Sequence, residues 1–171
     1  MTNLFERSDA ILSPCELYRY RLSRIWDDSR PLLVWAMLNP STADSFLDDP
    51  TIRRVRSFSH DADAGGFFVV NLFAWRSSSP EKMFRVEREG QDIVGPDNDQ
   101  HIREACSGHR VVVAWGAGAS AEVGDRRANG VLALLASIGV KPLCLGRTKL
   151  GEAPRHPLYV AADQPLIRWQ P

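Results

Sequence analysis

One uninterrupted apolar segment constrains the fold of this chain more than any other feature. Leu32–Leu38 has the sequence LLVWAML and runs directly into the polar segment Asn39-Pro40-Ser41-Thr42. A run of this kind, with β-branched and aromatic members, is typical of a strand that is buried on both faces of a parallel sheet. Ligands in open α/β sheets bind beyond the carboxyl ends of the strands. We therefore expect the residues from Asn39 onward to lie at a functional site.

The same pattern recurs at Gly66–Arg76, with the sequence GFFVVNLFAWR, where an apolar run ends at Asn71. Parallel strands deliver the residues at their carboxyl ends to the same edge of a sheet. An amide side chain both donates and accepts hydrogen bonds. Asn39 and Asn71 together therefore predict a site that recognises a polar, planar ligand.

The size and charge of the chain limit its function. We predict a single domain over residues 1–171, with an N-terminal extension at 1–31 and a core at 32–160. The chain has 21 basic and 21 acidic residues, which argues against coating long nucleic acid but allows a local basic pocket. The N-terminal residues lack the apolar core of a signal peptide, and no apolar run approaches the roughly 20 residues of a membrane helix. These features favour a cytoplasmic protein that does not contact a membrane.

The cysteines and histidines predict neither a disulfide framework nor a metal site. The chain has three widely spaced cysteines, Cys15, Cys106 and Cys144. An odd number without close pairs indicates reduced thiols. His60, Asp61 and Asp63 lie near a predicted helix end without a second histidine at a metal-binding spacing. We expect no metal and no cofactor.

Strand and helix patterns alternate along the chain. Tyr18–Trp26 alternates polar and apolar residues, and the turn signal at 27–31 predicts that it lies antiparallel beside Leu32–Leu38 as an edge strand. Further strands are predicted at Phe67–Phe73, Arg110–Trp115 and Val140–Leu145. Helices are predicted at Thr51–Asp63 after the cap Asp49-Pro50, at Asp97–Cys106, and at Ala119–Ile138 with a break near Gly124 or Gly130; Met83–Glu89 is a short helix or a loop.

This alternation predicts right-handed βαβ units. We therefore expect an α/β fold, a three-layer α/β/α sandwich with a mainly parallel four-stranded central sheet and an N-terminal edge strand.

A glycine motif follows the third predicted parallel strand. Gly116–Ala121 fits G-x-G-x-x-A, the pattern of a dinucleotide-binding turn. However, such turns follow the first strand of their unit, and the next strand here ends in Leu145-Gly146-Arg147 without an acidic partner for a ribose. A tight turn that only glycine permits, with close strand-to-helix packing, explains the motif better. Binding of NAD or NADP through Gly116–Gly118 stays open as an alternative.

Two further features are candidates for the site. His156 lies in a long polar loop, Gly146–Pro157, beyond the last predicted core strand. Long ordered loops often carry function. Phe73 and Trp75 follow Asn71 closely, where an aromatic ring either stacks on a base or packs in the core.

Four motifs in order resemble the uracil-DNA glycosylase-like superfamily. They are the Asn39-Pro40 loop, VVNLFAWRSSSP from Val69, VVVAWGAGA from Val111 and PRHPLY from Pro154, and they span roughly residues 32–160. More closely, LNPSTAD, NLFAWR and GPDND resemble a family of small bacterial and phage proteins without an assigned function. The resemblance to the superfamily implies an α/β/α fold and the recognition of a nucleobase.

The resemblance also implies roles for individual residues. Asn39 would position an attacking water, Asn71 would bind the polar edge of the base, and His156 would stabilise negative charge on the departing base. A phenylalanine, Phe46 or Phe73, would stack on the ring of a flipped or single-stranded base. The expected ligand-binding set is Pro40, Ser41, Phe46, Asn71, Phe73 and Arg76, and the expected catalytic set is Asn39, Asp44 and His156.

The chain departs from the superfamily pattern in two respects. Asn39 cannot act as a general base, so Asp44, Asp48 or Asp49 would have to compensate. Three cysteines cannot form the four-cysteine iron–sulfur site of the thermostable branch. These departures leave two functions open: hydrolysis of an N-glycosidic bond in a nucleotide or single-stranded nucleic acid with a natural or modified base, or binding of such a ligand without catalysis.

Overall fold

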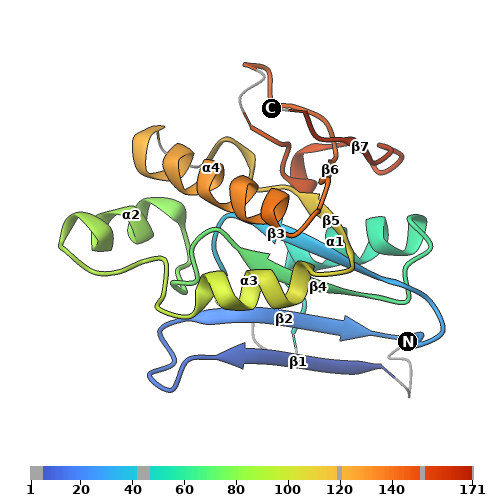
Figure 1. Ribbon diagram of the computed structural model, residues 1–171, viewed down its shortest axis with the longest axis horizontal. Coiled ribbons are helices and arrows are strands. Elements are labelled where there is room, and N and C mark those ends of the chain that lie inside the picture. The colour runs from blue at the N-terminus through green and yellow to red at the C-terminus, as the bar shows by residue number, and fades with distance from the viewer. Residues whose placement is uncertain (1–5, 42–46, 119–120, 151–152, 171) are drawn as a thin grey trace.

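A seven-stranded mixed sheet forms the centre of the molecule (Figure 1). The computed structural model describes residues 6–41, 47–118, 121–150 and 153–170. The strands are β1 (Arg7–Leu12), β2 (Arg19–Ile25), β3 (Leu32–Met37), β4 (Gly66–Asn71), β5 (Arg110–Val113), β6 (Leu143–Cys144) and β7 (Ile167–Arg168). They lie in the order β1-β2-β4-β3-β5-β6-β7. The run from β4 to β6 is parallel, whereas β1, β2 and β7 pair antiparallel with their neighbours.

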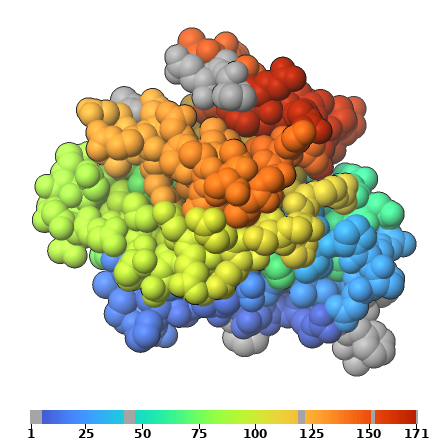
Figure 2. All heavy atoms as spheres, in the orientation of Figure 1, coloured from blue at the N-terminus to red at the C-terminus, as the bar shows by residue number. Residues whose placement is uncertain are grey.

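Helices cover both faces of this sheet, so the predicted α/β class is confirmed. α1 (Pro50–Asp61) packs on one face together with Leu33 and Trp35 of β3. The other three, α2 (Pro80–Arg88), α3 (Asn98–Cys106) and α4 (Ala121–Ser137), pack on the opposite face. That face is turned to the viewer in Figure 2, where α4 is orange and α3 is yellow-green. No helix in the described part of the chain is long and apolar enough to cross a membrane.

The N-terminal strand has a different neighbour from the one predicted. β2 pairs with β4 rather than with β3, and β1 forms the edge beyond it. Two glycines at the start of β4 permit this insertion: a Cβ on Gly65 would lie 1.9 Å from the carbonyl oxygen of Asp27, and one on Gly66 would lie 2.6 Å from that of Arg24. Only glycine fits at these two positions, and the absence of side chains there allows β4 to lie between β2 and β3.

The helices follow local signals in the sequence. Asp49 caps α1 by accepting a hydrogen bond from the backbone N–H of Ile52 at 2.8 Å. Ser79 caps α2 in the same way, which makes a helix of a segment that the sequence left open between helix and loop. α4 runs through Gly124 and Gly130 without the predicted break.

The C-terminal part contains less regular structure than predicted. The strand expected at Val140–Leu145 is reduced to the two residues of β6. The segment that follows His156 forms a short 3-10 helix, η2 (Pro157–Tyr159). β1 and β7 were not predicted.

An extra residue in β2 changes which side chains face which layer. Successive residues of β1 lie opposite Arg21 and Arg19, so Tyr20 is the additional residue of a β-bulge. Strict alternation would place Arg19 on the same face as Arg21, whose guanidinium covers the Phe68 ring on the α3 side. Instead, Tyr20 turns to that side and stacks on His101 of α3, with 4.6 Å between ring centroids. Arg19 is thereby directed to the layer of α1.

Candidate functional site

A cleft of about 670 Å³ opens at the carboxyl ends of the parallel strands. Its floor comes from the ends of β3, β4 and β5, and its walls come from the first turn of α1, the short 3-10 helix η1 (Gly116–Gly118) and the segment around η2. β4 and β5 lie on either side of β3, so the cleft occupies the point where the direction of strand addition reverses. Open α/β sheets bind ligands at such a point, and the volume lies in the usual range of roughly 300–1,000 Å³.

Four of the predicted site residues line this cleft. Asn39 and Ser41 follow β3, Asn71 ends β4, and His156 precedes η2. The structure therefore brings the two strand-end asparagines and the distal histidine to one place.

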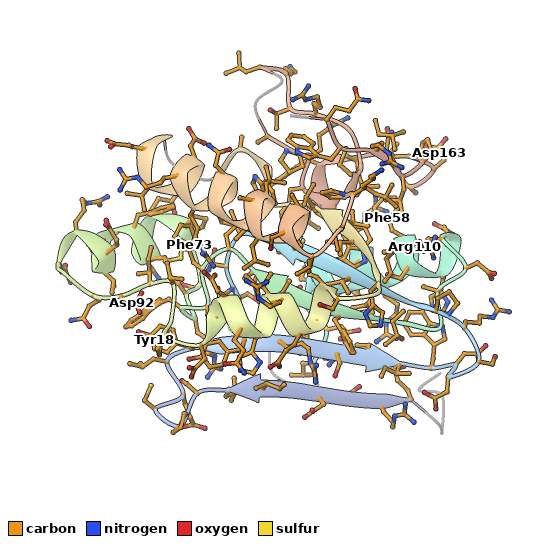
Figure 3. All side chains as sticks on the ribbon, viewed as in Figure 1. Tyr18, Phe58, Phe73, Asp92, Arg110 and Asp163 are labelled. Carbon is orange, nitrogen blue, oxygen red and sulfur yellow. The ribbon has the colours of Figure 1, made fainter. Side chains whose placement is uncertain are left out.

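Other predicted residues lie elsewhere. Phe73, which is labelled in Figure 3, is fully buried. Its ring packs edge-on against that of Phe84 of α2, with 5.6 Å between ring centroids. The Arg76 guanidinium donates from Nη1 to the carbonyl oxygen of Glu16 at 3.1 Å, and its side chain does not line the cleft. The aromatic side chains that do line the cleft, among the described residues, are Trp115 and Tyr159, which were not predicted as site residues.

Asn39 is held by two backbone carbonyl groups. Its Nδ2 donates to the carbonyl oxygen of Pro40 at 3.1 Å and to that of Ser77 at 3.2 Å. Because a carbonyl only accepts, these contacts fix the amide and leave Oδ1 as the polar atom that Asn39 offers to a ligand. Pro40 contributes through its backbone, since its carbonyl oxygen also accepts from the N–H of Ser77 at 3.1 Å.

Asn71 carries a buried donor without a partner. The side chain is 2% exposed, and its Nδ2 forms no hydrogen bond with any described residue. By contrast, its backbone carbonyl oxygen accepts from Nδ2 of Asn98, on α3, at 3.0 Å. Leaving a buried donor unpaired costs about 1–3 kcal/mol. Native proteins tolerate such a cost mainly at functional sites, so the Asn71 amide indicates a ligand with an acceptor at this position.

His156 offers a second donor. Its Nδ1 accepts a hydrogen bond from the backbone N–H of Leu158 at 3.3 Å, so the proton of the neutral ring lies on Nε2. Burial lowers the pKa of His156 below its ordinary value of 6.5, and the carboxylate of Asp49 opposes this only in part. The ring is therefore neutral at pH 7.

Two contacts hold the His156 segment in place. Gly116 has a φ of +71°, and a Cβ there would lie 3.0 Å from Cβ of His156, so only glycine allows this close approach. Arg54 of α1 donates to the carbonyl oxygen of Pro157 at 3.3 Å and to that of Val160 at 2.8 Å. The glycine motif after β5 therefore has a structural use, namely the packing of η1 against the His156 segment.

Asp49 is the one carboxylate among the described lining residues. Besides capping α1, it accepts a hydrogen bond from Oγ of Ser41 at 2.5 Å. Asp48 points elsewhere and pairs with two arginines, Arg24 and Arg56. Of the three acidic residues considered as substitutes for a general base, Asp49 is thus the one that lines the cleft; Asp44, like Phe46, falls outside the described residues.

Arg19 is a lining residue that the sequence did not indicate. It is 3% exposed, and the bulge at Tyr20 directs it to the cleft. Burial lowers its pKa to about 10, while Asp49 raises it and the charges of Arg76 and Arg24 lower it further. Arg19 is therefore still a cation at pH 7. Alternation along β2 places it on the opposite face, so the sequence contained no signal for this residue.

The described residues contain no group of three or more His, Cys, Asp or Glu side chains that is able to hold a metal ion. Arg147 lies with its guanidinium carbon 4.9 Å from the centroid of the Trp169 ring and does not line the cleft. The turn Gly116–Gly118 does line the cleft, so binding of a dinucleotide through it stays a prediction.

The chain matches, over residues 19–158, the profile of a family described as "Protein of unknown function (DUF1643)". It belongs to this family. No curated protein and no solved structure matches the chain. The DUF1643 segment includes every described lining residue of the cleft except Tyr159. Membership assigns no activity, so the function has to be inferred from the chemistry of the cleft.

Proposed function

We propose that the cleft recognises a nucleobase, carried on a nucleotide or a single-stranded nucleic acid, and hydrolyses its N-glycosidic bond. The observation that carries the proposal is Asn71, a residue that lines the cleft and whose buried Nδ2 has no partner in the described chain. Carbonyl and ring-nitrogen acceptors at the edge of a base suit such a donor. Its burial makes it selective, because a ligand without an acceptor would leave it unpaired.

The remaining groups suit cleavage of the bond between base and sugar. The bond from C1′ to the base nitrogen breaks, and its electron pair leaves with the base. The Nε2–H of His156 stabilises the negative charge that develops there. A water held by Oδ1 of Asn39 adds to C1′ and passes its proton to the carboxylate of Asp49. The departing base then takes up one proton and Asp49 releases the one it received, so the products are the neutral free base and a sugar with a hydroxyl group at C1′.

Base release provides the direct test. Single-stranded oligonucleotides that contain uracil, hypoxanthine or hydroxymethyluracil are incubated with the protein, and the free base is quantified by chromatography. His156→Gln is expected to lower the rate about 10²–10³-fold, as the loss of one donor to a developing anion does. The matched control is His109→Gln. His109 precedes β5, at the end of the strand remote from the cleft, so this substitution is expected to leave the rate unchanged. Equal rates for wild type and His156→Gln, or no release of any base, would refute hydrolysis.

Two observations favour a second function, binding without catalysis. The side chain at the end of β3 is an amide, which cannot take a proton from water at neutral pH. Both carboxylate oxygens of Asp49 already accept hydrogen bonds. In a sensor, nucleotides would raise the unfolding temperature of the protein while no base is released. Loss of that rise in Asn71→Leu, with no base release from wild type, would support this second function.

A further inference from the structure

The positive charge of the cleft contrasts with the neutrality of the whole chain. The chain has 21 basic and 21 acidic residues. Among the described charged residues that line the cleft, however, Arg19, Lys149 and Arg155 are basic, and Asp49 is acidic. The cleft therefore favours a ligand with negative charge.

The three basic residues do not lie at the same depth. Lys149 and Arg155 belong to the polar segment after β6, and Lys149 is exposed. Arg19 lies on β2 inside the sheet and is 3% exposed. Burying a guanidinium is costly unless charge and hydrogen bonds compensate for it. The charge of Asp49 supplies part of this compensation, and Arg19 remains a buried cation that lines the cleft.

Two independent observations concern this cleft, and they come from the neighbouring strands β2 and β4. The bulge at Tyr20 reverses the side to which Arg19 points, and bulges next to active sites commonly redirect a side chain in this way. The Asn71 amide lines the same cleft, and its buried Nδ2 has no partner among the described residues. A guanidinium and an amide N–H supply donors only, and a compact oxyanion supplies acceptors only.

We propose that Arg19 and Asn71 form a subsite for a compact oxyanion group of the ligand, a ring carboxylate or a phosphate. If the oxyanion is a carboxylate on the base, this inference rests on the proposed function. In that case, bases that carry an acidic group are the preferred ligands. A guanidinium binds a carboxylate or a phosphate through two parallel N–H···O bonds, which adds geometric selectivity to the attraction between charges.

Isothermal titration calorimetry with three probes tests the subsite: uracil, 5-carboxyuracil and inorganic phosphate. None of the three has a glycosidic bond, so hydrolysis does not interfere. Wild-type protein is expected to bind 5-carboxyuracil at least about tenfold more tightly than uracil. Arg19→Met removes this preference and leaves uracil binding within about twofold, and Arg19→Lys retains part of the preference because it keeps the charge. The matched control is Arg21→Met, which removes the same charge from the other face of β2 and keeps the preference.

The outcomes separate this inference from the proposed function. Equal affinity for uracil and 5-carboxyuracil, or an equal loss of both in Arg19→Met, overturns the subsite and leaves base recognition intact. Arg19-dependent binding of phosphate, without binding of either ring, supports the subsite and refutes base recognition. Binding of none of the three probes overturns both. Urea unfolding verifies that each variant is folded. If Arg19→Met does not fold, the comparison of Arg19→Lys with wild type tests the subsite instead.

Discussion

Replacing Asn71 by leucine is expected to stabilise the protein while it abolishes ligand binding. The two side chains have the same number and branching of heavy atoms, so the substitution replaces a buried donor that lacks a partner with an apolar group. Relief of an unpaired buried donor is worth about 1–3 kcal/mol. Because a leucine is bulkier, we take the lower end, about 1 kcal/mol, which corresponds to a rise in Tm of about 2–4 °C for a domain of this size.

Urea unfolding at 25 °C, followed by far-UV circular dichroism, measures the change in the free energy of unfolding. Asn98→Leu is the matched control, since Asn98 is also an asparagine with 0% exposure. Its Nδ2, however, donates to the carbonyl oxygens of Asn71 at 3.0 Å and Leu72 at 3.2 Å. Leucine deprives these carbonyls of a donor, and it also removes Oδ1 of Asn98, which has no partner among the described residues, so the net cost is expected to be about 1 kcal/mol.

The two asparagines should thus respond in opposite directions although both are buried. A loss of stability in Asn71→Leu as large as that in Asn98→Leu would refute the reasoning. It would mean that the Asn71 amide is fully hydrogen-bonded without a ligand, and that its burial says nothing about what the cleft binds.

Three further predictions concern the walls of the cleft and the ion pairs below it. Gly116→Ala is expected to destabilise the protein by about 1–2 kcal/mol in urea unfolding, because Gly116 has a φ of +71° and the added Cβ would lie 3.0 Å from Cβ of His156. The control is Gly130→Ala, in the interior of α4 with open space around it, which should stabilise the protein by about 0.5–1 kcal/mol in the same assay. Burial lowers the pKa of His156 below 6.5, so the unfolded chain binds this proton more readily than the folded protein. The stability that the neutral His156 ring contributes is complete above pH 6.5 and is lost as the pH falls below that value. In unfolding curves from about pH 7.5 to 5, the free energy of unfolding should therefore depend less on pH for His156→Gln than for wild type. An unchanged slope would contradict the neutral ring. Asp48→Asn removes the carboxylate that pairs with Arg24, whose side chain is 2% exposed, and should lower the free energy of unfolding by about 3 kcal/mol. A decrease below about 1 kcal/mol, the value of a surface ion pair, would show that other groups compensate the charge of Arg24.

Some elements of the fold are determined locally, and these are predictable from the sequence. The apolar runs at Leu32–Leu38 and Phe67–Phe73 predict central strands because a strand covered on both faces has no polar side. Asp49-Pro50 predicts the start of α1 because the cap and the proline act within one turn. Which strands become neighbours is not local. The placement of β2 beside β4 depends on the space that Gly65 and Gly66 leave, and this becomes visible only when three strands are assembled.

The same distinction applies to the candidate site. Asn39 and Asn71 each follow an apolar run, so they were predictable, and their convergence with His156 followed from the order of the strands. Arg19 was not predictable. A single additional residue reverses the side to which a strand side chain points, and the sequence of β2 contains no local signal for the bulge at Tyr20.

The walls of the cleft come from nearly opposite ends of the chain, with Arg19 on β2 and Tyr159 in η2. During synthesis the N-terminal elements emerge first, but a chain that stops before Pro157 lacks the wall that η2 provides. A ligand of the cleft therefore stabilises only chains that include η2, by about 2.7 kcal/mol at a concentration one hundred times its Kd. In a cell that supplies the ligand, chains that include η2 would resist proteolysis better than chains that stop before it.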